Sequence, residues 1–119
     1  MKKLIILIVL FFQSLGAAAQ ETDLQALFTA YLQRAQQGDS TAQANLGVLY
    51  LEGRGVQANA QKAAQWFHQA AQQGHTLAQY NLGVLYRQGR GVTQDDQQAL
   101  KWFRKAAGQG YHLAQNNLA

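Results

Sequence analysis

Residues 40–75 read STAQANLGVLYLEGRGVQANAQKAAQWFHQAAQQGH, and residues 76–111 read TLAQYNLGVLYRQGRGVTQDDQQALKWFRKAAGQGY. When the second stretch is laid on the first, 20 of the 36 positions are identical. A period of this length marks proteins that stack one small structural unit on the next. The two copies also provide an internal comparison, because positions kept equal report on packing and positions that differ report on the surface.

Each copy predicts a pair of helices, because its apolar residues recur at three- and four-residue spacing. In the first copy, a helix is predicted over Ser40–Leu51, with Ser40 as its N-cap and Gly53 closing it in the left-handed conformation. A second helix follows the N-cap Asn59 and runs to Gln73. The second copy repeats this prediction 36 residues later.

A glycine lies inside each predicted first helix, at Gly47 and Gly83. Glycine in a helix interior costs about 1 kcal/mol relative to alanine. Because both copies accept this cost, we expect the paired helix to approach closely, with Ala63 and Ala99 as the small residues opposite.

The shared pattern A-x-x-N-L-G-x-L-Y-x-x-G-x-G-V, followed by K-A-x-x-W-F-x-x-A-A-x-x-G in the first copy, resembles the Sel-one-like repeat family, relatives of the tetratricopeptide repeats. The resemblance covers Ser40–Ala119, although Asn59 stands where the family usually has Asp. It implies an all-α fold, a right-handed α-solenoid of antiparallel helix pairs. It also implies that ligands lie along a concave groove lined by the first helices.

The start of the chain has the pattern of a secretory signal. Lys2 and Lys3 precede the apolar run Leu4–Phe12, and small residues follow at Ala17 and Ala19. Nine apolar residues are too few for a bilayer span, which needs roughly 20. The pattern therefore predicts cleavage before residue 20 and a mature chain in the bacterial periplasm or secreted beyond it, with no membrane span.

The repeats and the signal together predict five segments. Residues 1–19 form the signal peptide, and residues 20–39 align with the second half of a repeat and form an N-terminal capping helix. Residues 40–75 and 76–111 are the two repeats. Residues 112–119 are the start of a third repeat or a C-terminal cap.

Charge and cysteine content narrow the possible partners. The chain carries 10 basic and 6 acidic residues, and removal of Lys2 and Lys3 with the signal leaves a net charge of +2. A net charge of +2 gives no basis for predicting a nucleic-acid partner, which requires basic residues clustered in a stripe. The chain contains no cysteine, so packing alone must hold the exported domain together.

The positions of the first helices that differ between the copies gather on one stripe of a helical wheel. In tetratricopeptide-like stacks this stripe lines the concave groove, where we expect a peptide or protein partner to bind. An uncommitted solvent face is the alternative interpretation. The predicted groove residues, with Thr41 at their start, are Ala44, Val48, Leu51, Glu52, Leu77, Tyr80, Val84, Arg87, Gln88, Leu113 and Asn116.

Other candidate chemistry has little support in the sequence. His68, His75 and His112 lack the spacing of metal ligands, so no metal or cofactor is predicted. The Trp-Phe pairs fall on the packed face and are assigned to the core. The Gly-Arg-Gly loops follow a helix rather than a strand, so they are interpreted as turns and not as phosphate cradles. Catalytic residues are not predicted, because Ser40, the single serine after the signal, is placed as a helix cap.

The sequence therefore favours an exported, non-catalytic interaction module or scaffold that holds a peptide or protein in the groove. An alternative is a secreted factor or inhibitor that acts on an envelope or host protein. A weaker alternative is a cell-wall or β-lactam-directed enzyme. Some cysteine-rich exported relatives are associated with β-lactams, but this chain lacks their disulfides, so their activity is not transferred.

Overall fold

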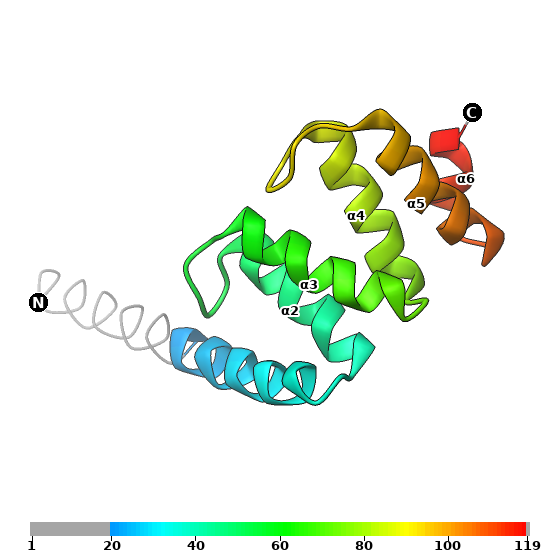
Figure 1. Cartoon of the computed structure of the whole chain (residues 1–119). Coiled ribbons are helices and arrows are strands. Elements are labelled where there is room, and N and C mark those ends of the chain that lie inside the picture. The colour runs from blue at the N-terminus through cyan, green and yellow to red at the C-terminus, as the bar shows by residue number, and fades with distance from the viewer. Residues whose placement is uncertain (1–19, 119) are drawn as a thin grey trace, which may run out of the picture.

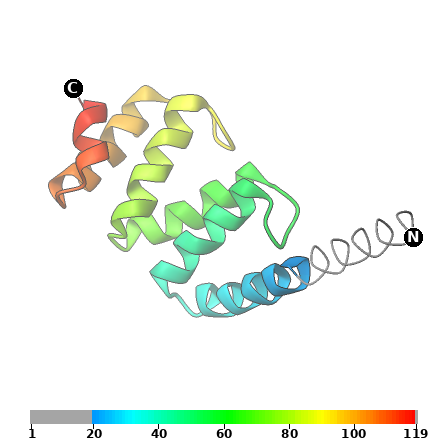
Figure 2. The ribbon, with the colours of Figure 1, turned by 180° about the vertical axis from the view of Figure 1, so that it is seen from behind.

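The computed structural model describes residues 20–118, and the predicted signal segment 1–19 lies outside them. Residues 20–36 form an N-terminal helix. It is followed by α2 (Ser40–Glu52), α3 (Ala60–Gln72), α4 (Thr76–Gln88), α5 (Asp96–Gly108) and α6 (His112–Leu118). The helices stack in chain order from the N-terminal helix to α6, as both views show (Figure 1 and Figure 2). The predicted all-α solenoid of antiparallel helix pairs is confirmed.

The helix ends follow the predicted capping chemistry except at the starts of α2 and α4, where the N-cap lies one residue earlier than predicted. Gly53 closes α2 in the left-handed conformation, at φ 68°, and Asn59 caps α3 by accepting from the Lys62 backbone N–H. The prediction of Ser40 as the N-cap of α2 is wrong. The cap is Asp39, whose carboxylate accepts the backbone N–H groups of residues 41 and 42 at 3.0 and 3.2 Å. The ionised side chain is a strong acceptor, so the helix boundary moves one residue toward the N-terminus.

The interior glycines serve close packing, but their main partners are not the predicted alanines. A Cβ atom built on Gly47 would lie 2.7 Å from the Cε1 atom of Phe67, and one on Gly83 would lie 2.7 Å from the same atom of Phe103. Both phenylalanines are buried. The Ala99 backbone oxygen also lies 3.2 Å from the Cβ atom built on Gly83. Each first helix therefore needs a glycine to accept a flat aromatic ring from its own second helix.

A buried glutamine joins each first helix to two second helices. Gln43 Nε2 donates to the backbone oxygen of Ala35 at 3.1 Å, at the end of the N-terminal helix. Its Oε1 accepts from Gln73 Nε2 at 2.8 Å, beyond the end of α3. One side chain thus fixes the distance between three consecutive helices, because both ends of a buried amide must be satisfied.

The same contact recurs once in full and once in part. Gln79 Nε2 donates to the Ala71 oxygen at 3.1 Å, and its Oε1 accepts from Gln109 Nε2 at 2.7 Å. Gln115 donates to the Ala107 oxygen at 3.4 Å but is exposed. The spacing of 36 residues between the three glutamines shows that α6 continues the repeat geometry.

The N-terminal helix makes the contacts of a second helix. A Cβ atom on Gly55 would lie 2.3 Å from the Leu24 backbone oxygen, and one on Gly91 would lie 2.2 Å from the Ala60 backbone oxygen. Leu24 and Ala60 are one period apart. The first loop therefore rests on residues 20–36 as the second loop rests on α3.

We expect Gly47→Ala to destabilise the fold although alanine favours helix. Overpacking against the buried Phe67 ring costs about 1–3 kcal/mol and outweighs a propensity gain of about 1 kcal/mol. Urea unfolding measures the difference. The control is Gly108→Ala, because no atom lies within 4 Å of that added Cβ and the change should be neutral or stabilising. A Gly47→Ala protein as stable as the parent chain would contradict this packing.

Candidate functional site

The predicted groove residues define a surface that we call the first-helix stripe. Its apolar members on α2 contribute little accessible area. Ala44 is 2% exposed and packs in the main core, so its assignment to the groove surface is corrected. Val48 and Leu51 are half-buried against the same core. Glu52 is exposed and pairs with Arg54 at 3.5 Å.

Two leucines form the exposed apolar part of the stripe. Leu77, the second residue of α4, is 41% exposed, and Leu113, the second residue of α6, is 50% exposed. They lie one repeat apart, at equivalent positions of neighbouring first helices. Their counterpart on α2 is the polar Thr41. The second repeat and α6 therefore present apolar side chains at a position where the first repeat does not.

The aromatic and the cation of the stripe are engaged inside the structure. The half-buried Tyr80 ring lies 5.0 Å from Tyr111 and 5.7 Å from Phe103, measured between ring centroids. The Arg87 guanidinium lies 5.5 Å from the Phe103 centroid and donates to Asn117 Oδ1. These two residues join α4 to the following elements. These contacts fix the positions of the Tyr80 and Arg87 side chains without a partner.

The remaining stripe residues complete a mixed surface. Val84 is half-buried against the core cluster that contains Phe103, whereas Gln88 and Asn116 are exposed. This combination of aliphatic and amide side chains offers apolar contact and hydrogen bonding. Within residues 20–118, no group of three or more His, Cys, Asp or Glu side chains is placed to hold a metal ion.

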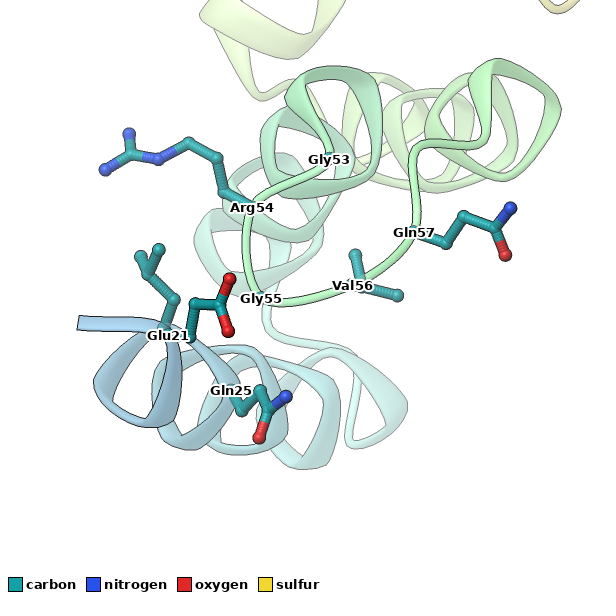
Figure 3. Close-up of a pocket in the computed structure, with 8 residues that line it drawn as sticks. Glu21, Gln25, Gly53, Arg54, Gly55, Val56 and Gln57 are labelled. Carbon is teal, nitrogen blue, oxygen red and sulfur yellow. The ribbon is translucent and has the colours of Figure 1, made fainter. Parts of the chain in front are cut away.

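A hollow of about 400 Å³ lies between the N-terminal helix and the Gly-Arg-Gly loop that joins α2 to α3. Glu21 projects from the N-terminal helix toward the loop, and Arg54 extends outward (Figure 3). A hollow of about 540 Å³ occupies the corresponding place one repeat later. The hollow recurs because each loop crosses the start of the preceding second helix, so it is a consequence of stacking.

The aromatic pairs and the remaining histidines also have structural places. Trp102 and Phe103 are buried, as is Phe67, which agrees with their assignment to the core. The His68 ring packs edge-on against Trp102, with 5.7 Å between centroids. His112 begins α6 and is exposed.

The family follows from comparison with known repeats. A family model described as the Sel1 repeat matches residues 40–75 and 76–111, which together make up more than half of the chain. The chain belongs to the Sel1 repeat family. Proteins with Sel1 repeats are generally protein-interaction scaffolds. No curated protein sequence shows a significant match.

Solved structures of several bacterial proteins are similar to this Sel1 repeat chain. The protective antigen c5321 of uropathogenic Escherichia coli, which displays an SLR fold, is 41% identical over 76% of this chain, with a TM-score of 0.76. A Sel1 repeat protein from Oxalobacter formigenes is 43% identical over 68%, with a TM-score of 0.67. Helicobacter pylori cysteine rich protein B is 29% identical over 79%, with a TM-score of 0.75.

This chain covers a different fraction of the length of each relative. This chain covers 20% of the antigen and 32% of the Oxalobacter protein, but 71% of the cysteine rich protein. No helix within residues 20–118 has both the length and the apolar content that a membrane span requires.

One titratable residue has a defined role at the junction of the two Sel1 repeats. His75 is the N-cap of α4, and its Nδ1 accepts the Ala78 backbone N–H at 3.2 Å. Partial burial lowers the pKa of His75, and the Asp39 carboxylate opposes this shift. The cap requires an unprotonated Nδ1, so the folded state favours neutral imidazole.

We expect acid to weaken this cap. Because the pKa is lowered on folding, the unfolded chain takes up the proton first as pH falls through the ordinary value of 6.5. The stabilisation is therefore complete above pH 6.5 and is lost below it. His75→Asn keeps a capping oxygen that does not titrate in this range, and should remove a pH-dependent loss of about 0.5–2 kcal/mol.

Urea unfolding at pH 7.5 and pH 5.0 measures this difference. His68 and His112 are common to both proteins, so the change in slope isolates His75. The same decrease in stability for the parent chain and His75→Asn would contradict the capping role.

Proposed function

We propose that the chain is an exported, non-catalytic interaction module that holds a peptide or protein partner on the first-helix stripe. The observation that carries this proposal is the exposed pair Leu77 and Leu113, one repeat apart on neighbouring first helices. Membership of a family of interaction scaffolds supports it. A partner that buries both leucines would gain apolar contact, while the exposed amides of Gln88 and Asn116 could supply hydrogen bonds elsewhere along the stripe.

Export is part of this proposal and depends on residues 1–19. Their two lysines, apolar run and small residues have the order of a secretory signal. The absence of cysteine is compatible with an oxidising compartment, since no disulfide is needed to hold the glutamine-linked helices together.

A role outside the cell is the second candidate. It is favoured by the similarity to the c5321 antigen of uropathogenic Escherichia coli, which is described as protective. An exported interaction module with the same stripe would serve either role, because the stripe defines the contact and not the compartment.

We expect Leu77→Glu to reduce capture of the partner from a bacterial envelope extract by about tenfold, which corresponds to about 1.4 kcal/mol. A buried carboxylate without a partner would oppose the apolar contact. Affinity capture followed by quantitative mass spectrometry measures the loss, and circular dichroism confirms that the fold is intact.

The matched control is Leu27→Glu. Leu27 is 40% exposed, close to the 41% of Leu77, but it lies on the N-terminal helix and outside the stripe. Its capture profile should equal that of the parent chain. Equal profiles for Leu77→Glu and Leu27→Glu would contradict the stripe as the binding surface.

A further inference from the structure

A cavity of about 460 Å³ lies between α3 and the loop that joins α4 to α5. None of its lining residues belongs to the first-helix stripe. Gln61 and Gln65 at its edge are exposed, so the cavity opens to solvent. The lining residues are Gln61, Ala64, Gln65, His68, Tyr86, Gly91 and Val92.

The equivalent position one repeat earlier, at the first junction, between the N-terminal helix and α2, is filled by an aromatic side chain. Phe28 stands one period before Ala64, and Tyr50 stands one period before Tyr86. The Phe28 ring packs edge-on against Tyr50, with centroids 5.3 Å apart and planes at 86°. Tyr50 is therefore only 8% exposed, whereas Tyr86 is half-buried. The second junction has the same tyrosine but lacks the ring that covers it.

The wall of the cavity is also more polar than its counterpart. His68 stands one period after Leu32, and Gln65 stands one period after Thr29. The edge-on contact with the buried Trp102 holds the His68 ring in place. The His68 imidazole thus replaces an apolar side chain and the Gln65 amide replaces a smaller one, whereas Gln61 keeps the glutamine found one period earlier at Gln25. All three side chains offer hydrogen bonds to a polar group at the edge of a ligand.

We propose that this cavity binds the side chain of a tyrosine from a partner polypeptide, seated against Tyr86 as Phe28 is seated against Tyr50. An aromatic ring suits the site because edge-to-face pairs of rings are favourable beyond their buried area. Tyrosine suits it better than phenylalanine because His68, Gln61 and Gln65 can pair with a phenol hydroxyl. The site shares no residue with the first-helix stripe, so the two binding proposals can be tested separately.

The test uses N-acetyltyrosine amide as the probe and the full chain labelled with ¹⁵N and ¹³C for NMR titration. We expect saturable shifts at the Ala64 methyl and the Tyr86 ring, with millimolar affinity. N-acetylphenylalanine amide should bind several times more weakly, and N-acetylleucine amide should cause no saturable shift there. Equal effects of the tyrosine and leucine amides would overturn the proposal.

Two variants test the comparison between the filled first junction and the open second junction. Ala64→Phe restores the covering ring and should abolish the shifts at Tyr86. Phe28→Ala opens the first junction and should create a second set of saturable shifts at Tyr50. Binding of the tyrosine amide that survives Ala64→Phe, or no new shifts in Phe28→Ala, would overturn the proposal. The second variant decides the question even if the first does not fold.

Discussion

The buried glutamine at the start of α2 and of α4 is the contact on which the stack depends. Its amide nitrogen donates to the last turn of the preceding second helix, and its oxygen accepts from a glutamine at the end of its own second helix. Apolar packing alone would let neighbouring repeats slide, because dispersion contacts are weakly directional. A buried amide that leaves either end unpaired costs about 1–3 kcal/mol. Gln43 and Gln79 therefore set the register from one repeat to the next.

On this fixed frame, successive units of the stack differ at the two sites proposed for binding. Leu77 of the second repeat stands in place of Thr41 of the first, and Ala64 of α3 stands in place of Phe28 of the N-terminal helix. In each case the backbone frame is the same, so the change alters only the surface. The first change adds exposed apolar area, and the second removes a ring and leaves a cavity. A scaffold can gain specificity in this way without altering the contacts that hold it together.

The sequence predicted the elements well because their signals are local. The glycine that ends α2 and the Asn59 cap could be assigned from single residues and their spacing. Contacts between helices were harder. Ala44 fell on the predicted groove stripe but is buried, because a helical wheel gives direction and not the depth at which a small side chain sits. The Phe67 ring opposite Gly47 was missed for the same reason. The 36-residue recurrence of Gln43, Gln79 and Gln115 was a usable signal for the inter-repeat bond. The cavity at Ala64 needed the structure to show that Phe28 covers Tyr50.

The most direct test of this account is the hydrogen exchange of glutamine side-chain amides, measured by NMR on the full chain. Gln43 and Gln79 are buried and doubly bonded, whereas Gln115 is exposed and bonded through its nitrogen to Ala107. We therefore expect slow exchange for the Nε2 protons of Gln43 and Gln79 and fast exchange for those of Gln115. Rapid exchange at all three positions would contradict the glutamine link between repeats.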